Sequence, residues 1–336
     1  MFALKYGFNW EDFSREILDS CTAFKGRKWY IFGMITIKSF LKKSNCEKNL
    51  AELLGVIIPN SVKLIRESIS NQKGELAGSE NASGEKQLAL DVQSNQIVVD
   101  ELQKSGLAES MASEELEGLV EGKKGAPFTV VFDPLDGSSL VDVNFAVGSI
   151  FGIYPAGNLI GRTGEDQLAA CFAVYGPHTT LVITFKKGTH EFRLNNKDGE
   201  FYLTKENLKI APESKYFAPG NLRAAAENEK YLKLTNDYIK RGLTLRYSGG
   251  MVPDINHILL KGSGIFTYPG YSKAPNGKLR LLFECNPMSL IAEQAGGQST
   301  DGHARILDKK ITELHQRTPI FIGSQTEVSK LPELLG

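Results

Sequence analysis

The sequence predicts a layered α+β protein, because helix and strand patterns occupy separate stretches of the chain. Up to about residue 105, apolar residues recur mainly at steps of three and four, as on one face of a helix. From there to about residue 205, short apolar runs alternate with turn residues, which is typical of strands. Beyond residue 205 the two patterns alternate, so we expect an N-terminal domain at 1–205 and a C-terminal domain at 206–336.

The N-terminal stretch is expected to be mainly helical. Its helical patterns cover Phe13 to Phe24, Leu50 to Ile58, Ser61 to Ser70 and Asp91 to about Gly106. Pro59 is expected to interrupt the second of these helices, because proline has no N–H to donate. Residues 71–88 read NQKGELAGSENASGEKQL and hold little apolar material, so we expect a mobile loop there.

Strands are expected next, and the C-terminal part mixes both kinds of element. The expected strands are PFTVVF, NFAVGSIFGIYP, QLAACFAVYG, TTLVITFKK and HEFRLNNKDGEFYL, the last with an Asn-Lys-Asp-Gly hairpin turn. A helix is expected from Glu227 to Arg241, and a strand from Leu279 to Phe283. Asn286 is expected to cap a further helix, which has Pro287 in its first turn and ends at Gly296.

Composition excludes several classes of protein. The 39 Lys and Arg balance the 39 Asp and Glu, so no overall field favours nucleic acid or an acidic membrane. With 41% hydrophobic and 23% charged residues the chain is ordinary globular material, and no apolar run is long enough to span a bilayer. Residues 1–13 lack the features of a secretory signal, so we expect a cytoplasmic protein, with an organelle left open.

Several motifs of catalytic chemistry are missing. The five histidines show no metal-binding spacing, and no GxSxG elbow accompanies a serine, which argues against zinc hydrolysis and catalytic triads. No GxGxxG or Walker loop is present, which argues against dinucleotide enzymes and P-loop NTPases. The four cysteines are far apart and form no CxxC pair, so we expect buried, reduced thiols.

The most informative stretch is VVFDPLDGSSL, at 130–140. A buried strand is expected to end at Phe132, so Asp133, Asp136 and the Leu135 carbonyl can converge at its edge, as a hard divalent cation requires. The small residues Gly137, Ser138 and Ser139 follow, and their backbone N–H groups suit a phosphate. A metal and a phosphate would then meet in one place. Taken alone, the same residues also suit a simple tight turn.

Other acidic residues support the metal interpretation. Glu114 and Glu115 follow a short strand pattern, and one of them would be buried unless a cation compensates it. Glu284 ends the apolar run LRLLF, where an unpaired carboxylate is costly. Some acidic residues also have a role without a metal. Glu114 and Glu115 can be exposed on the surface, Asp91 can cap a helix, and Glu85 can be solvated.

Basic and aromatic residues form a second candidate set. It consists of Arg246, Tyr247, Tyr268, Lys278 and Arg280. In an alternating strand, Lys278 and Arg280 would share one face, and a pair of positive charges suits a phosphate. The alternative is a solvated strand face.

In these motifs the chain resembles the sugar bisphosphatases, the family of fructose bisphosphatase and sedoheptulose bisphosphatase. The resemblance is carried by GSENASGEKQLALDVQSN, ASEE, FDPLDGSS, VGSIFGIYP, RYSGGMVPD, GKLRLLFECNP and AGGQSTDG. The sedoheptulose branch is the closer likeness, through stretches such as FDPLDGSSLVDVNFAVG and LTLRYSGGMVPDIN. By contrast, FTYPGYSKAPNGKLRLLFECNPM and HQRTPIFIGS are closer to the fructose branch.

The resemblance implies an α/β/α/β/α fold in which two sheets are sandwiched between helices, and a homodimer or homotetramer. It implies hydrolysis of the 1-phosphate of sedoheptulose 1,7-bisphosphate to sedoheptulose 7-phosphate and phosphate, with fructose 1,6-bisphosphate as a second substrate. Two alternatives stay open. One is a fructose-1,6-bisphosphatase of gluconeogenesis, and the other is a catalytically silent sensor of metal and sugar phosphate.

The resemblance also implies roles for single residues. Two or three Mg²⁺ ions, or Mn²⁺ in their place, would be held by Glu114, Asp133, the Leu135 carbonyl, Asp136 and Glu284. Asp91 and Glu115 would position and deprotonate the attacking water, and Glu85, where the family usually has aspartate, would close over the metals. The phosphate that leaves would be bound by Gly137, Ser138, Ser139 and Arg280. The remaining phosphate would be bound by Asn221, Arg246, Tyr247, Tyr268 and Lys278, with Gly249 and Met251 beside the sugar.

Two departures from the fructose branch bear on substrate and regulation. That branch places a tyrosine three residues after the match to Asn221, where this chain has Ala224, and the neighbouring Arg223 offers a longer, charged donor. This exchange favours a phosphate displaced outward by one carbon. The AMP-binding turn of the fructose branch is missing, and Pro127 and Phe128 replace its Lys-Tyr pair, so the resemblance does not extend to AMP inhibition.

Overall fold

Two β-sheets organise the part of the chain that the structure describes. The structure is a computed structural model, and it describes residues 35–71, 76–80 and 86–335. The first sheet has eight strands in the order β10-β9-β8-β7-β6-β5-β3-β4, and all its neighbours are antiparallel except the parallel pair β3 and β5. Its strands are β3 (Ala108–Ser113), β4 (Val120–Glu121), β5 (Phe128–Asp136), β6 (Val147–Pro155), β7 (Ala169–Tyr175), β8 (Thr179–Thr184), β9 (Thr189–Leu194) and β10 (Phe201–Lys205).

The second sheet has five strands in the order β12-β11-β13-β15-β14. Here β11 is parallel to both β12 and β13, and β15 is antiparallel to β13 and β14. The strands are β11 (Tyr216–Pro219), β12 (Thr244–Leu245), β13 (Ile265–Tyr268), β14 (Gln298–Thr300) and β15 (Ile320–Gly323).

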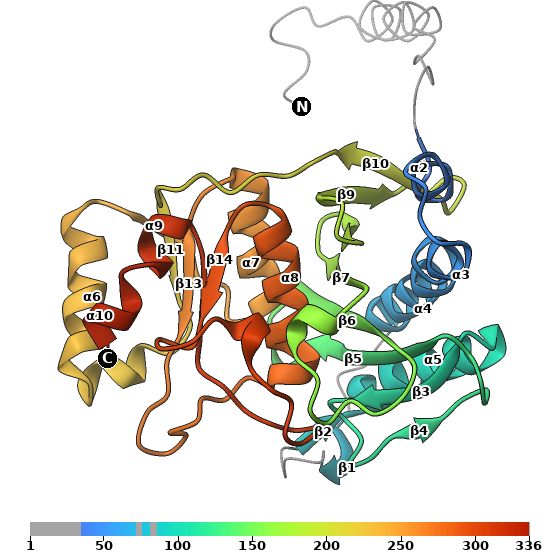
Figure 1. The fold of residues 1–336 in the computed structure, drawn as a ribbon, viewed down its shortest axis with the longest axis horizontal. Coiled ribbons are helices and arrows are strands. Elements are labelled where there is room, and N and C mark those ends of the chain that lie inside the picture. The colour runs from blue at the N-terminus through green and yellow to red at the C-terminus, as the bar shows by residue number, and fades with distance from the viewer. Residues whose placement is uncertain (1–34, 72–75, 81–85, 336) are drawn as a thin grey trace, which may run out of the picture. The chain divides into compact units, whose positions relative to one another are not determined.

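Helices form three layers around these sheets (Figure 1). On the outer side of the first sheet lie α2 (Ile37–Lys43), α3 (Lys48–Glu52), α4 (Ile58–Asn71) and α5 (Ala89–Ser105). Between the sheets lie α7 (Met251–Lys261) and α8 (Asn286–Gln294), which contact strands of both. Beyond the second sheet lie α6 (Glu229–Lys240), α9 (Gln325–Val328) and α10 (Leu331–Leu335). The layered α/β/α/β/α fold expected from the resemblance is confirmed.

Burial explains why the layers stack in this way. The core between the sheets takes its side chains from alternate positions on the strands, such as Ile150 and Phe172, and from the inner faces of α7 and α8, such as Ile255 and Met288. A second apolar cluster, with Phe217 on β11, fills the space between the second sheet and α6. Each large apolar side chain buried here contributes roughly 1.5–3 kcal/mol relative to exposure.

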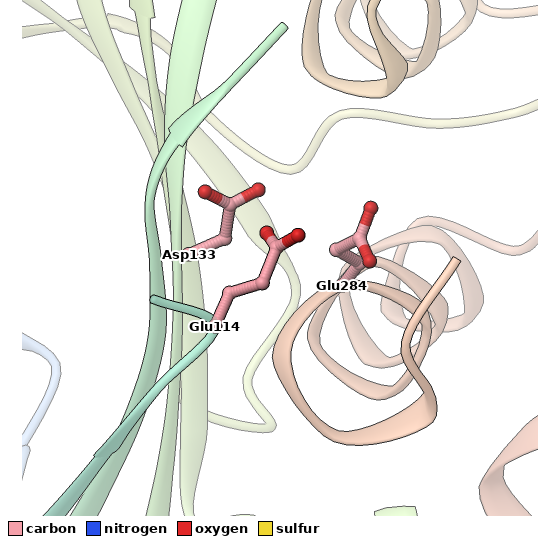
Figure 2. A group of neighbouring side chains, drawn as sticks. All are labelled: Glu114, Asp133 and Glu284. Atoms are coloured by element: carbon pink, nitrogen blue, oxygen red, sulfur yellow. The ribbon is translucent and has the colours of Figure 1, made fainter. Parts of the chain in front are cut away.

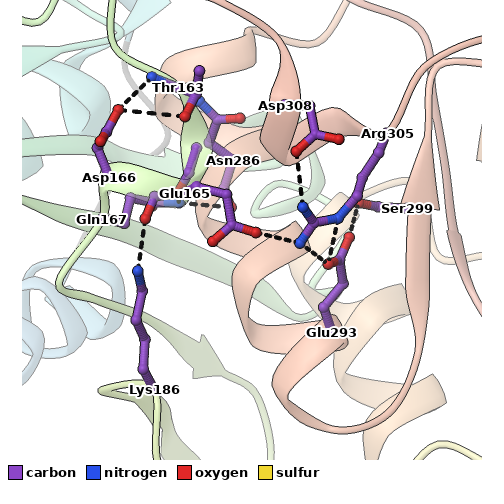
Figure 3. Close-up of polar contacts among 11 residues, drawn as sticks. Thr163, Glu165, Asp166, Gln167, Lys186, Asn286, Glu293, Ser299, Arg305 and Asp308 are labelled. Atoms are coloured by element: carbon purple, nitrogen blue, oxygen red, sulfur yellow. Dashed lines mark hydrogen bonds and ion pairs between the residues drawn. The ribbon is translucent and has the colours of Figure 1, made fainter.

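Polar contacts add a link between the first sheet and α8 (Figure 3). Arg305 donates to Glu293 on α8, to Asp308, and to Glu165 in the short 3₁₀ helix Gly164–Asp166 that precedes β7. Gln167 donates from its side chain to the Asn286 carbonyl, 3.1 Å away. The loop before β7 is thereby attached to α8, the helix that follows the π-helical turn at 281–285.

Two sequence expectations about helices and strands are wrong. Pro59 does not end a helix, because the chain is π-helical over Leu53–Ile57 and continues as α4 from Ile58. The wider turn comes directly before proline, whose missing N–H makes a regular turn unfavourable. The expected strand at 279–283 is also wrong, because Leu281–Cys285 is π-helical and continuous with α8. A short buried apolar run does not distinguish strand from helix.

Two further boundaries differ from expectation. The stretch 71–88 is not a loop throughout, because β1 (Leu76–Glu80) pairs with β2 (Lys86–Leu88) in antiparallel fashion. Strand β5 does not end at Phe132 but continues to Asp136, with an irregular register between Asp133 and Asp136. The helical pattern at Phe13 to Phe24 lies outside the described residues.

Most other elements agree with the sequence. The helix from Asp91, the helix after Glu227 and the hairpin between β9 and β10 are all present. Asn286 lies inside a continuous helix and does not cap one. In the described residues no helix is both long and apolar enough to cross a membrane.

Candidate active site

A pocket of about 290 Å³ opens where the end of β5 meets the start of α7 and the π-helical turn before α8. It collects side chains and backbone from both domains that the sequence suggested. The residues that line it are Asp91, Glu114, Glu115, Asp133, Leu135, Asp136, Gly137, Ser138, Ser139, Tyr247, Gly249, Gly250, Met251, Phe266, Tyr268, Lys278, Leu279, Arg280 and Glu284.

The end of β5 presents the first acids of this pocket. All nine residues of the strand are buried, including Asp133 and Asp136. The irregular register between these two aspartates redirects the side chains of the last strand residues, as β-bulges do. Local hydrogen bonds hold the bend, because the Leu135 N–H donates to Asp133 Oδ1 at 2.9 Å and the Ser149 hydroxyl donates to the Pro134 carbonyl at 2.6 Å.

Three carboxylates meet at the closed end of the pocket. Glu114 follows β3, Asp133 lies on β5, and Glu284 lies in the π-helical turn that leads into α8. One oxygen from each lies within 4.8 Å of the others, and all three residues are buried. Figure 2 shows their carboxyl groups facing a shared space between the strands and the helix. Segments that are 170 residues apart in the chain (284 minus 114) thus supply one cluster.

The electrostatics of this cluster call for added positive charge. Burial raises the pKa of Asp133 well above its usual range, and the neighbouring Glu114 carboxylate raises it further. The pKa of Glu284 is raised in the same direction by burial and then by Glu114. Burial raises the pKa of Asp136 to about 6, although the Val252 N–H favours its charged form. Hard oxygen ligands that are costly to ionise together fit a divalent cation.

Arg280 supplies one positive charge to the cluster. Its Nη1 lies 2.9 Å from Glu114 Oε1, and its backbone N–H donates to Glu284 Oε2 at 2.6 Å. The arginine therefore touches two of the three clustered acids. One guanidinium cannot balance three carboxylates, so the cluster still lacks positive charge.

The start of α7 holds the fourth acid and borders a glycine-rich turn. Asp136 accepts the Val252 N–H at 2.7 Å and the Met251 N–H at 3.4 Å, as expected for a carboxylate at a helix N-terminus. Gly137 has a φ of 77°, in the left-handed region that favours glycine, and it opens the short 3₁₀ helix Ser138–Leu140. Asp136, a candidate metal ligand, is therefore followed directly by the small residues that suit a phosphate.

The outer end of the pocket carries aromatic and basic groups. Tyr247, Tyr268 and Lys278 line it. The Tyr247 hydroxyl donates to the Gly220 carbonyl at 2.9 Å. Burial raises the pKa of Tyr247 to about 12, and the positive charge of Arg223 acts in the opposite direction. Arg223 therefore lies close enough to influence this end of the pocket, although it does not line it.

Three of the expected site residues do not line the pocket, and a fourth lies outside the described residues. Asn221 is buried, and its amide donates to the Pro269 carbonyl at 3.0 Å. Arg246 is exposed, and its guanidinium donates to the carbonyl of the preceding Leu245 at 2.8 Å. Arg223 is exposed, and Glu85 lies outside the described residues. Their roles stay predictions.

Sequence reasoning missed four residues at or beside the site. Gly250, Phe266 and Leu279 line the pocket without any chemical signature of their own. The fourth is Asp254, a buried acid on α7 that accepts the Ser248 N–H at 2.9 Å and so holds the glycine-rich turn. Asp254 lies inside the RYSGGMVPD motif, and the available signal was an acidic residue where the first turn of a helix follows a glycine pair.

Known proteins resemble this chain over most of its length. The model of the fructose-1-6-bisphosphatase N-terminal domain matches residues 32–206, and the model of the C-terminal domain matches residues 210–336. The chain is 42% identical over 308 residues to a class 1 fructose-1,6-bisphosphatase of Geobacter sulfurreducens, covering 90% of this chain and 96% of that protein.

A plant enzyme and a solved structure are similar as well. A chloroplastic sedoheptulose-1,7-bisphosphatase of Triticum aestivum is 42% identical over 304 residues, covering 89% of this chain and 76% of that protein. The crystal structure of Leishmania major fructose-1,6-bisphosphatase in holo form matches with a TM-score of 0.84 and 35% identity, over 90% of this chain and 98% of that one. Both substrate names thus occur among the proteins that this chain resembles.

Proposed function

The chain belongs to the fructose-1,6-bisphosphatase family and is therefore a phosphoric monoester hydrolase of sugar bisphosphates, and we propose that its preferred substrate is sedoheptulose 1,7-bisphosphate. It would release the 1-phosphate and leave sedoheptulose 7-phosphate, with fructose 1,6-bisphosphate as a second substrate. The observation that carries metal-dependent hydrolysis is the buried cluster of Glu114, Asp133 and Glu284 beside a pocket with cationic side chains.

The family is metal-dependent, and the donor set of this pocket fits Mg²⁺, with Mn²⁺ as a substitute. We assign two or three ions per subunit to Glu114, Asp133, the Leu135 carbonyl, Asp136 and Glu284. Bound there, the metal would supply positive charge that offsets the carboxylates and draws electron density from the phosphate oxygens. The raised pKa values of Asp133 and Glu284 support this assignment, because both carboxylates are costly to ionise without a cation.

The proton steps fall to two acids outside the cluster. Asp91, in the first turn of α5, and Glu115, after β3, both line the pocket. They would orient the attacking water and take its proton. The water oxygen then bonds to phosphorus while the bond between phosphorus and the ester oxygen on sugar carbon 1 breaks. The sugar oxygen takes up a proton, so the products are inorganic phosphate and the sugar monophosphate.

Binding of the two phosphates divides the pocket. Arg280, Gly137, Ser138 and Ser139 lie beside the acids and would bind the phosphate that leaves. Tyr247, Tyr268 and Lys278 would bind the phosphate that stays, together with Asn221 and Arg246. Arg246 is exposed, and its side chain would reach the pocket of a neighbouring copy. Gly249 and Met251 also line the pocket and would lie beside the sugar. Glu85 would act on the same site as the acid that closes over the metals.

The seven-carbon preference rests on the outer end. Position 224 is an alanine, whose side chain has no hydrogen-bond donor for a phosphate, and it is fully buried in the second apolar cluster. Arg223 is the neighbouring cation, and its charge already acts on Tyr247. A phosphate displaced outward by one carbon would come closer to this guanidinium.

Steady-state kinetics on both bisphosphates at one Mg²⁺ concentration test the proposal. We expect a specificity constant for the sedoheptulose ester at least equal to that for the fructose ester. A tenfold higher value for the fructose ester would instead identify a fructose-1,6-bisphosphatase. Tight binding of both esters without turnover would identify a silent sensor.

Three broader expectations belong to the same proposal. Residues 1–205 would form the metal-binding domain and residues 206–336 the sugar-phosphate domain. The protein would act as a homodimer or homotetramer in the cytoplasm. Size-exclusion chromatography with light scattering tests the assembly.

A further inference from the structure

One histidine connects the two chain segments that supply the clustered acids. His315 lies between α8 and β15, in the motif HQRTPIFIGS. Its Nε2 lies 2.9 Å from the carbonyl oxygen of Leu116, which is 199 residues earlier in the chain. Leu116 directly follows Glu114 and Glu115, so the contact falls on the turn that carries both acids.

The chemistry of this contact defines the role of the ring. A carbonyl oxygen can only accept, so Nε2 carries the hydrogen and donates it. The other nitrogen, Nδ1, is buried and has no hydrogen-bond partner among the residues that the structure describes. The contact to Leu116 is thus the polar interaction by which the ring is oriented in this part of the chain.

His315 and the next residue, Gln316, also contact the π-helical turn that carries Glu284. The ring of His315 packs on Phe283, with centroids 5.2 Å apart, and Phe283 directly precedes Glu284. The Gln316 carbonyl accepts the Leu281 N–H at 2.7 Å, at the start of the same π-helical turn. His315 therefore touches both walls of the cluster from outside the pocket.

The turn after β3 has mainly local bonds of its own. The Leu116 N–H donates to the Ser113 carbonyl at 3.3 Å, and the Glu115 N–H donates to the Ser113 hydroxyl at 3.2 Å. These bonds fold the turn. The side chain of Glu114 links it to Arg280, at the start of the π-helical turn before α8, and the Leu116 carbonyl bonded to His315 is a second link, made by the backbone of the turn.

We propose that His315 is a positioning residue, which fixes the Glu114 and Glu115 turn relative to Glu284 and so sets the geometry of the cation site. The inference rests on the proposed function, because it assumes that the clustered carboxylates bind a divalent cation. Groups that orient metal ligands from behind typically change metal affinity by about 10-fold to 100-fold when they are removed.

Three substitutions separate the donor from the bulk of the ring. His315→Gln places an amide nitrogen as many bonds from Cβ as Nε2 and keeps the donor. His315→Asn is chemically matched but one bond shorter, so it cannot reach Leu116 in the same pose. His315→Leu keeps apolar bulk against Phe283 and removes the donor. His303→Leu, at an exposed histidine away from the pocket, is the control.

Two quantities are measured. The first is the affinity of the metal-free protein for Mn²⁺, determined from the electron paramagnetic resonance signal of the free ion. The second is the Mg²⁺ concentration that gives half-maximal turnover. We expect His315→Leu and His315→Asn to weaken Mn²⁺ binding by at least about tenfold, and His315→Gln and His303→Leu to stay within about threefold of wild type. Melting temperatures are measured in parallel. His315→Gln and His315→Asn should have similar melting temperatures, although their affinities for Mn²⁺ should differ.

The outcomes distinguish the two levels of the proposal. Wild-type affinity in His315→Leu, or equal losses in His315→Gln and His315→Asn that follow melting temperature, would overturn the positioning role. If the wild-type protein binds no Mn²⁺ and hydrolyses neither bisphosphate, the proposed function itself fails, and the positioning role fails with it.

Discussion

The guanidinium of Arg280 lies 2.9 Å from the carboxylate of Glu114, and both side chains are buried at the closed end of the pocket. Its backbone N–H also binds Glu284, so one residue contacts acids from two different elements. A buried ion pair contributes little beyond the cost of desolvation, but removing one partner leaves a buried charge without compensation. The Arg280 side chain is therefore critical for the metal-free state and for phosphate binding.

Replacing Arg280 should destabilise the metal-free protein. We expect Arg280→Met to lower the free energy of unfolding by about 3 kcal/mol, because Glu114 is left beside Asp133 and Glu284 without a cation. Saturating Mg²⁺ should recover part of this loss. Urea unfolding with and without Mg²⁺ measures both effects.

The matched control is Arg305→Met, which removes an exposed arginine and its ion pairs with Glu165, Glu293 and Asp308. Exposed pairs contribute little, so we expect a loss of about 1 kcal/mol or less. Arg280→Met that is as stable as wild type in EDTA would contradict the charge imbalance inferred for the cluster.

Asp136→Asn should remove most of the activity and leave the fold intact. The asparagine oxygen can still accept the Val252 N–H, which is 2.7 Å from the carboxylate, so the start of α7 should keep its contact. Loss of the charge should reduce kcat by at least about 100-fold. Activity assays and melting curves on the same preparation check this prediction, and a variant with full activity would be incompatible with Asp136 as a ligand.

Arg223 should matter more for the seven-carbon ester than for the six-carbon ester. Arg223→Ala is expected to lower kcat/KM for sedoheptulose 1,7-bisphosphate by about tenfold, the loss of one charge-assisted hydrogen bond, with a smaller effect on fructose 1,6-bisphosphate. Arg193→Ala, at an exposed position on β9, is the control. Equal losses on both esters would show that Arg223 does not select the substrate.

Asp254 should make stability depend on pH in the metal-free protein. Burial raises the pKa of Asp254 from 3.8 to about 7, although its hydrogen bonds to Ser248 favour the charged form. Between these values the folded protein holds a proton that the unfolded chain has lost, so this contribution to stability is present below about pH 4 and is lost as pH rises to 7. Asp254→Asn should reduce the pH-dependent change in the free energy of unfolding by up to about 4 kcal/mol. Urea unfolding between pH 4 and 8 measures it, and identical curves for both proteins would refute the assignment.

Much of the candidate site could be predicted because its residues occupy conspicuous places in the sequence. Asp133, Asp136 and Glu284 follow apolar runs, where a carboxylate needs a specific partner. Their convergence could not be derived from spacing alone, because Glu284 reaches the cluster only through the packing of α8 between the sheets. The role of His315 was invisible for the same reason, since its partner is 199 residues away.

The errors in the fold have local causes. The run at 279–283 is short, apolar and fully buried once folded, which removes the alternation that would distinguish a strand from a helix. At Pro59, the preceding π-helical turn let the chain continue as a helix, an arrangement that residue pattern does not indicate. The pairing of β1 with β2 depends on backbone hydrogen bonds in a polar stretch, where hydrophobic periodicity carries no information.

Phosphorus NMR of sedoheptulose 1,7-bisphosphate incubated with the protein tests the central proposal most directly. In Mg²⁺, we expect the 1-phosphate signal to disappear while inorganic phosphate appears in equal amount and the 7-phosphate signal persists. In EDTA, both sugar phosphate signals should remain. Equal hydrolysis with and without Mg²⁺, or none in either, would contradict a metal-dependent bisphosphatase at this pocket.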